Sequence, residues 1–235
     1  NDSSVNDFST FEFNLLYGLY MKIIAMIPAR LGSQRLKQKN LQLIHGEALI
    51  AHAIRKAKLS NVFDEIWVNS EADIFGEIAK DQNVGFHKRP DKLADNHATS
   101  EDFVYEFLRK HECDYLVQVH SVAPLLTVRD TVSFVNALKD IKPDVLLSVE
   151  DIQIECAFQN IPFNFNYDEK TNSQDLYPIE RITWSITAWK RDTYIDAYQA
   201  GLCATYAGKI QYHPIDKLAS HVIKTQNDLD IANAL

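Results

Sequence analysis

Residues 22–41 read KIIAMIPARLGSQRLKQKNL, and this stretch sets the fold class of the chain. Its first part, residues 22–29, is a short apolar run that is typical of a buried strand. A basic loop containing Gly32 follows, and residues 48–59 then repeat apolar side chains at the spacing of one helix face. A strand, a loop and a helix in this order form the first unit of an α/β protein.

The same alternation continues through the first two thirds of the chain. Thr99 and Asp102 have the spacing of a capping box, and Thr127 is the expected cap of the helix that follows it. The pattern predicts a three-layer α/β fold, with a mostly parallel sheet covered by helices on both faces. We expect strands at residues 65–70, 84–89, 114–120 and 144–150, and helices at residues 72–82, 101–111 and 128–138.

The pattern changes after Glu150. Residues 151–181 are rich in Asn, Phe, Tyr and Asp without a clear period, so we interpret them as an inserted arm. The regular pattern returns with a strand at 182–190, followed by a helix, a short strand and a closing helix. Aromatic side chains of the arm would form an unusually exposed apolar set in a monomer: Phe158, Phe163, Phe165 and Tyr167.

Length and composition limit the class of protein. The 235 residues contain 46% apolar and 24% charged residues, which is ordinary for a globular protein, and we place a single domain at residues 21–235. Residues 1–20 precede Met21 and are interpreted as an extension outside the fold, with a bound helix or strand as the alternative. The chain has 24 Lys and Arg residues and 32 Asp and Glu residues, so its net charge is 24 − 32 = −8. Nucleic-acid binding is therefore not expected.

Cysteine usage and hydropathy indicate the compartment. The three cysteines are widely separated and show no C-x-x-C spacing, so neither a zinc site nor a disulfide framework is expected. A reducing, cytoplasmic location is the expectation. No apolar run approaches the roughly 18 residues of a transmembrane helix, so no membrane partner is expected.

The loop after the first strand carries the main functional signal. Between Lys22 and Gly46 there are five basic residues and no acidic one, a local reversal of sign in an acidic chain. Gly32 would let the backbone approach a ligand, and Arg30 and Lys39 can donate charge-assisted hydrogen bonds to phosphate oxygens. Ligands of open α/β sheets bind beyond the carboxyl ends of the strands, so the loop predicts a polyphosphate site. The alternative is a solvated basic turn, and the common ATP and NAD motifs are absent.

Three motifs resemble the acylneuraminate cytidylyltransferase family, which holds CMP-sialic acid synthetases and relatives for legionaminic, pseudaminic and Kdo-type sugar acids. Residues 28–40 fit PAR-x-G-S-x-R-x-x-x-KN, residues 89–100 fit RP-x-x-LA-x-x-x-A-[ST]-S, and residues 118–127 fit Q-x-x-x-x-[SA]-PLLT. Residues 173–189 are similar to a further stretch of the family, but more loosely. The resemblance spans residues 22–235.

The resemblance implies a fold like that of the nucleotide-diphosphosugar transferases, with an intersubunit arm and therefore a homodimer. It implies a reaction that joins CTP and a 2-keto-3-deoxy sugar acid into a CMP-sugar and pyrophosphate. The anomeric oxygen would attack the α-phosphorus, with Arg, Lys and Mg²⁺ stabilising the growing charge. The alternatives are a degenerate relative that binds a nucleotide or sugar without turnover, and a nucleotidyltransferase for another sugar.

The resemblance also implies roles for individual residues. Three of these residues have a structural role as the alternative. Arg89 could cap a loop, and Ser100 could be the N-cap of helix 101–111. Gln118 could form hydrogen bonds with backbone groups at a sheet edge. Arg30 and Lys39 would be the catalytic residues. The expected nucleotide contacts are Arg30, Gly32, Ser33, Lys39, Asn40, Arg89 and Ser100, and the expected sugar contacts are Gln118, Gln174 and Arg181.

The last loop departs from the family pattern D-x-D-T-x-x-D-L. Val222 and Lys224 stand where the family has its two metal-binding aspartates, whereas Thr225 and Asp228 keep the spacing of a helix cap. His120 stands where Kdo-activating relatives have a further aspartate. The metal ligands are therefore unknown: Lys224 replaces one positive charge of the cation, or the triphosphate and water hold Mg²⁺, or another carboxylate reaches the site. The candidate carboxylates are Asp216, Glu150 and Asp151.

Overall fold

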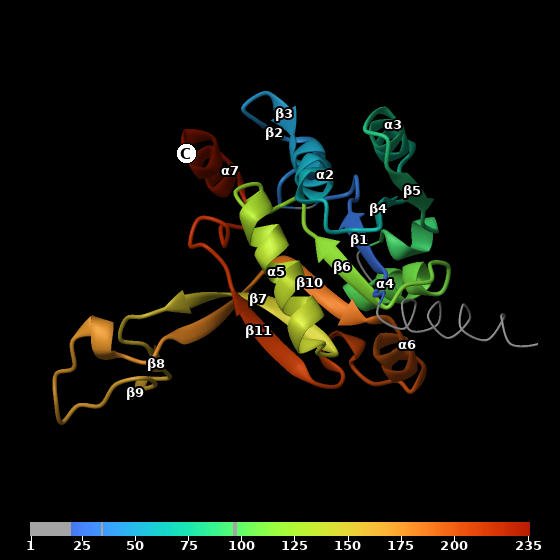
Figure 1. The fold of residues 1–235 in the computed structure, drawn as a ribbon. Coiled ribbons are helices and arrows are strands. Elements are labelled where there is room, and N and C mark those ends of the chain that lie inside the picture. The colour runs from blue at the N-terminus through green and yellow to red at the C-terminus, as the bar shows by residue number, and fades with distance from the viewer. Residues whose placement is uncertain (1–19, 34, 96–97) are drawn as a thin grey trace, which may run out of the picture.

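The computed structural model describes residues 20–33, 35–95 and 98–235, so the interpretation of the N-terminal extension lies outside the described residues except at Tyr20. Seven strands form one sheet in the order β11-β7-β10-β6-β1-β4-β5 (Figure 1). The neighbours β1, β4, β5 and β6 run parallel, as do β7 and β11, while β10 runs antiparallel to β6 and β7. The predicted mostly parallel sheet is therefore confirmed. The strands are β1 (Ile23–Pro28), β4 (Glu65–Ser70), β5 (Gly85–Lys88), β6 (Tyr115–Val119), β7 (Val145–Ile152), β10 (Ile179–Lys190) and β11 (Ile210–Pro214).

Helices cover both faces of the sheet, which gives the predicted three layers. Side chains of β1 alternate, with Ile23 and Ile27 in the core beneath α2, α3 and α5, and Ile24 and Met26 in the core beneath α4 and α6. Burial on both faces explains why the strand reads as a continuous apolar run. The helices are α2 (Leu49–Ser60), α3 (Asp73–Asp81), α4 (Ser100–Leu108), α5 (Val128–Ile141), α6 (Arg191–Gln199) and α7 (Gln226–Ala234). None of the described helices is both long and apolar enough to cross a bilayer.

Three helices begin at a threonine that forms a capping box. Thr99, Thr127 and Thr225 each accept a hydrogen bond from the backbone N–H three residues later, and the aspartate there accepts one in return. The caps expected from the sequence are confirmed. Ser100 is the first residue of α4 and not its N-cap, so that alternative is wrong, because Thr99 already occupies the position.

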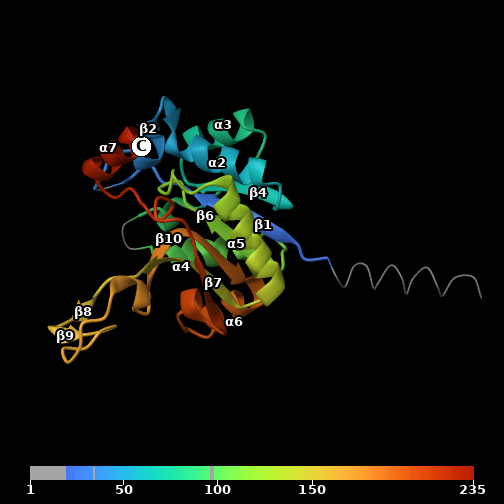
Figure 2. The same cartoon turned by 60° about the vertical axis from the view of Figure 1, so that its left-hand side comes forward.

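The arm projects away from the sheet in both views (Figures 1 and 2). It carries a small hairpin of β8 (Ala157–Phe158) and β9 (Ile161–Pro162). Both ends of the predicted segment belong to the sheet, because β7 runs to Ile152 and β10 begins at Ile179. Residues 153–178 are therefore the part of the arm outside the main sheet.

The parallel strands end at one edge of the sheet, where the loops after β1, β6 and β7 and the start of β10 meet. The loop after β1 is anchored below by a separate apolar cluster, in which Leu36 packs with Ile44 and Leu49, and with Ile223 and Leu229 at the end of the chain. A hairpin of β2 (Leu43–Ile44) and β3 (Glu47–Ala48) joins this cluster to α2. Segments from both ends of the sequence thus build one edge.

Candidate active site

The basic loop is held to the edge of the sheet by buried polar contacts. Glu71, which follows β4, accepts the backbone N–H of Leu31 at 2.8 Å through one carboxylate oxygen. Arg89, which follows β5, donates to the other oxygen of Glu71 at 2.9 Å and to the carbonyl of Ala29 at 2.8 Å. The Asn40 side chain donates to the carbonyl of Arg30 at 3.1 Å. The contact between Asn40 and Arg30 therefore ties the end of the loop to its start, and the basic side chains take no part in these hydrogen bonds.

Arg89 is in consequence a buried structural residue as well as a predicted nucleotide contact. Its guanidinium is 3% exposed and also lies 4.9 Å from the centre of the Phe103 ring. Its Nε has no hydrogen-bond partner among the described residues. The contact with Ala29 agrees with the alternative that Arg89 caps the loop. Ser100 lies on the surface at the start of α4.

Asn40 connects the loop to the end of β6. The hydroxyl of Ser121 donates to the Asn40 side-chain oxygen at 2.7 Å, and both residues are buried. Together with its contact to Arg30, this leaves Asn40 with a positioning role in the structure. The predicted nucleotide contact by Asn40 stays a prediction.

Four cations converge beside this loop. Burial lowers the pKa of Lys39 below its usual value, and the charges of Arg35, Arg30 and Lys224 lower it further. Lys224 comes from the end of the chain, so tertiary folding adds it to the basic residues that the sequence places together. Within the described residues, no acidic side chain forms an ion pair with any of the four. Such a group of unpaired charges favours binding of a polyanion.

Gly32 and Ser33 form the exposed turn of the loop. The backbone N–H of Ser33 donates to the carbonyl of Leu31 at 3.0 Å. A Cβ built on Gly32 meets no described atom within 4 Å, and its φ lies outside the left-handed region. The fold therefore gives no steric reason for glycine here, which leaves open the predicted close approach of a ligand.

Gln118 and His120 lie at the end of β6, next to these cations. The Gln118 amide contacts the His120 ring at 2.8 Å, while its oxygen has no partner among the described residues. β6 lies between β10 and β1, so Gln118 is not at a sheet edge, and the alternative that it binds backbone groups there is wrong. Burial, with a further contribution from Lys39, lowers the pKa of His120 to about 4, so the ring is neutral at pH 7. Gln118 thus presents an unpaired acceptor near the expected sugar site.

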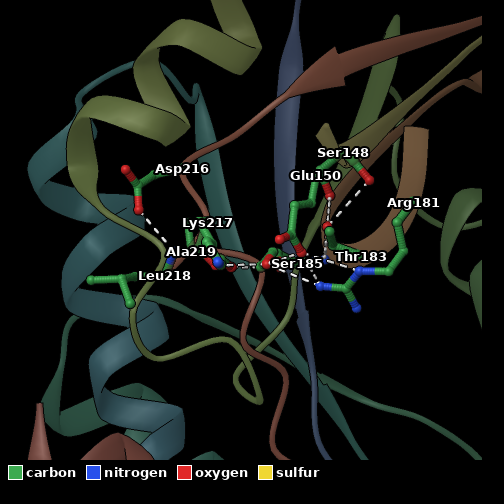
Figure 3. Close-up of polar contacts among 10 residues, drawn as sticks. Ser148, Glu150, Arg181, Thr183, Ser185, Asp216, Lys217, Leu218 and Ala219 are labelled. Carbon is green, nitrogen blue, oxygen red and sulfur yellow. Dashed lines mark hydrogen bonds and ion pairs between the residues drawn. The ribbon is translucent and has the colours of Figure 1, made fainter. Parts of the chain in front are cut away.

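A pocket of 520 Å³ is lined by Arg181 and by Lys224, whereas no residue of the loop 29–40 lines it. Arg181 forms an ion pair with Glu150 of β7 and donates to the Ser220 hydroxyl at 3.1 Å; Figure 3 shows Arg181 and Glu150 pointing toward each other. Ser220 in turn lies 2.8 Å from the same Glu150 oxygen. Burial alone would raise the pKa of Glu150, yet hydrogen bonds from Arg181 and Ser220 hold it below its usual value. Arg181 therefore already holds a carboxylate of this chain.

Trp184 lines the same pocket from an irregular turn of β10. The strand register shifts between Ile182 and Thr187, and Trp184 has a φ of 60°, in the left-handed region. For a bulky residue this conformation costs on the order of 1–3 kcal/mol, and such bulges are frequent beside binding sites. The sequence shows a regular strand here, so Trp184 could not be predicted.

The structure does not bring every predicted residue to the pocket. Gln174 lies in the short helical turn Ser173–Asp175 of the arm, with its side chain exposed and its backbone carbonyl bound to Gln153. It does not line the pocket that contains Arg181. Its predicted contact with the sugar acid would have to be made away from that pocket or in another copy of the chain.

The described residues do not offer a carboxylate pair for Mg²⁺. Glu150 is engaged by Arg181 and Ser220, and Asp151, the next residue of β7, is exposed and does not line the pocket that contains Arg181. Asp216 is exposed and accepts the backbone N–H of Leu218 at 2.8 Å. In the described part of the chain there is no group of three or more His, Cys, Asp or Glu side chains able to hold a metal ion. Of the three carboxylates left open by the sequence, only Glu150 lines the pocket that contains Arg181, and it is already engaged, so these three do not form a Mg²⁺ site there.

A basic loop and a pocket at the carboxyl edge of a mostly parallel sheet define the class of α/β proteins that bind phosphorylated ligands beyond their strands. The chain matches the family model described as cytidylyltransferase over residues 24–228. It belongs to the cytidylyltransferase family.

Individual relatives agree with this assignment. The N-acylneuraminate cytidylyltransferase of Escherichia coli O18:K1:H7 is 33% identical over 121 residues, which cover 50% of this chain and 28% of that protein. The CMP-N,N'-diacetyllegionaminic acid synthase of Legionella pneumophila is 44% identical over 59 residues, 25% of either chain. The chain spans less than half the length of the curated relatives it matches first.

A solved structure shows the same fold. A CMP:2-keto-3-deoxy-manno-octonic acid synthetase complexed with CTP superposes with a TM-score of 0.68 at 17% identity, covering 91% of this chain and 97% of that one. The fold expected from the resemblance, that of the sugar nucleotidyltransferases, is therefore confirmed.

Proposed function

We propose that this chain transfers the cytidylyl group of CTP to a 2-keto-3-deoxy sugar acid of the sialic, legionaminic, pseudaminic or Kdo type. The observation that carries the proposal is the convergence of Arg30, Arg35, Lys39 and Lys224, none of them ion-paired to an acid among the described residues, with Lys224 also lining the pocket that contains Arg181. The triphosphate would bind the four cations, and the sugar carboxylate would compete with Glu150 for Arg181. The names of the relatives, which concern CMP-sialic and CMP-legionaminic acids, support the choice of CTP and sugar acid.

In the proposed reaction the anomeric hydroxyl oxygen forms a bond to the α-phosphorus of CTP. The bond from the α-phosphorus to the oxygen of the β-phosphate breaks, pyrophosphate leaves, and the hydroxyl proton passes to solvent. Arg30 and Lys39 would stabilise the negative charge that grows on the phosphate oxygens. No step is assigned to Mg²⁺, since the described side chains do not supply its usual ligands.

We further propose a homodimer in the cytoplasm. The arm exposes Phe158 (67%), Phe163 (69%) and Tyr167 (75%), whereas Phe165 is half-buried and packs edge-on against Tyr167. So much exposed aromatic surface favours contact with another copy. The cytoplasmic location is supported by cysteines that are free thiols in the described chain.

Pyrophosphate release from a matrix of nucleoside triphosphates and sugar acids tests the activity. We expect release only with CTP and a sugar acid of the proposed class. Binding of CTP without release under any condition would instead make the chain a degenerate nucleotide-binding relative, a reading that the replaced aspartates at Val222 and Lys224 favour. Release with a neutral sugar or a sugar phosphate would assign it another nucleotidyltransferase reaction.

A further inference from the structure

Lys224 occupies a backbone position that the structure fixes from two sides. The backbone N–H of Ile223 donates to the carbonyl of Val122 at 2.8 Å, which ties the segment to the loop after β6. The N–H of Lys224 itself donates to Asp228 at 2.9 Å, within the capping box of α7. Lys224 is therefore not on a free tail, and its side chain starts from a defined place at the edge of the sheet.

The neighbour at the other replaced position has a different environment. Val222 is half-buried and packs against the main apolar core. Val222 also lines the pocket that contains Arg181 and Glu150, together with the exposed Lys224. Both replaced positions thus reach the same pocket: Val222 contributes an apolar side chain there, and Lys224 presents a cation.

The charge of Lys224 reaches the phosphate side of the site. It is one of three cationic side chains that disfavour the protonated form of Lys39. Asp228 is the acid that opposes them, and its carboxylate already accepts three hydrogen bonds from Lys224 and Thr225 in the helix cap. Four positive groups gathered in this way repel one another, and a polyanion with several negative oxygens relieves that repulsion.

We infer that Lys224 supplies, in this chain, the positive charge that a protein-held divalent cation would supply at the triphosphate, so that CTP binds without a protein-held metal. The inference rests on the proposed function, because it concerns the same phosphate site. An ammonium group is a compact charge with three donors, so it can neutralise a phosphate oxygen but cannot bridge two of them with octahedral geometry. Arg30, Arg35 and Lys39 then share the remaining charge.

Titration calorimetry of CTP in excess EDTA and in millimolar Mg²⁺ tests the inference through binding alone. The parent chain should bind CTP in EDTA with an affinity within about threefold of that in Mg²⁺. Lys224→Met should weaken binding in EDTA by about 10- to 100-fold, the loss typical of one hydrogen bond to a charged group. Lys224→Arg, which keeps the charge, should restore most of the affinity.

A second pair of variants separates charge from folding. Val222→Asp with Lys224→Asp should bind CTP poorly in EDTA and regain affinity in Mg²⁺. Lys139→Asp makes the same replacement of lysine by aspartate at an exposed residue of α5 that does not line the pocket containing Lys224, and it should leave CTP binding unchanged. Thermal unfolding of each variant shows whether it is folded. The single variants Lys224→Met and Lys224→Arg answer the question if the double variant does not fold.

The possible outcomes distinguish the inference from the proposed function. Parent binding of CTP that requires Mg²⁺ would overturn the inference and leave the proposed function standing. Unchanged affinity of Lys224→Met in EDTA would also overturn it. No binding of CTP in either condition would instead remove the proposed function, and the inference with it.

Discussion

Arg89 and Glu71 form a buried ion pair directly beneath the basic loop, and neither residue is exposed enough to be a free surface charge. Their side chains are 3% and 14% exposed. Each also binds backbone of the loop, at Ala29 and Leu31 respectively. At the scale of single residues, the loop therefore depends on a pair that does not belong to its own segment of sequence.

Replacement of Arg89 should act first on stability. Arg89→Met leaves the carboxylate of Glu71 buried without its partner, which costs about 3–5 kcal/mol of the free energy of unfolding. Arg89→Met combined with Glu71→Gln should recover part of that loss, because the uncompensated charge is gone. Urea denaturation of both variants measures the difference. Reduced CTP affinity of Arg89→Met at unchanged stability would mean that Arg89 is mainly a ligand contact.

The basic side chains of the loop should act on binding instead. Arg30→Ala and Lys39→Ala should each weaken CTP binding by about 1.5–3 kcal/mol, the range for hydrogen bonds to charged groups. Lys37→Ala is the matched control, because Lys37 is exposed and does not contribute to the lowered pKa of Lys39. Calorimetry that finds the same CTP affinity in all three variants as in the parent would contradict the phosphate role of the loop.

The arm is the element through which we propose that the chain contacts a second copy. Apart from its small hairpin, residues 153–178 pack little apolar surface, and Tyr177 next to β10 is 86% exposed. An element that exposes this much aromatic surface and projects from the sheet is expected to be covered in an assembly (Figures 1 and 2).

Light scattering at micromolar concentration should give twice the mass of 26.9 kDa. Phe163→Ser with Tyr167→Ser should shift the chain toward the monomer, because it removes apolar area from the proposed interface. Circular dichroism serves as the control that the sheet remains folded. A parent chain of monomer mass would contradict the dimer.

At the scale of the whole molecule, one buried histidine, His87, and two half-buried ones, His111 and His120, favour the neutral form and contribute to the response to acid. His87 contacts His111 at 2.9 Å and Glu106 at 2.6 Å, and His111 packs between Phe107 and Trp67. Burial, with a contribution from His87, lowers the pKa of His111 to about 4, and burial with Lys39 does the same for His120.

Because these folded-state pKa values lie below the unfolded value near 6.5, the unfolded chain binds more protons between the two. The stability contributed by the neutral rings is complete above about pH 6.5 and is lost as the pH falls toward 4. We expect a loss on the order of 1–2 kcal/mol for each of the two rings between pH 7 and pH 5. His111→Gln should reduce that loss in urea denaturation, whereas His45→Gln on the exposed β2–β3 turn should not. Equal losses in both variants and the parent would contradict this account.

Local sequence determined the helices and strands and the basic composition of the loop after β1. Apolar runs of strand length, helix-face spacing and three threonine caps specify their elements through neighbours within a few residues, and they were predicted correctly. Arg30 and Lys39 belong to the same short loop, so their proximity could also be predicted from the sequence. The replacement of two aspartates by Val222 and Lys224 was visible as well, but not its consequence.

Only the tertiary structure decided which distant side chains meet at the site. Glu71 beneath the loop, the ion pair of Arg181 with Glu150, and the approach of Lys224 to Lys39 all join segments far apart in the chain. The left-handed backbone of Trp184 arises from a shift in strand register, which no local pattern records. Local spacing specifies secondary structure because its contacts are local, whereas a binding site is built from contacts across the sheet, and those depend on strand order and register.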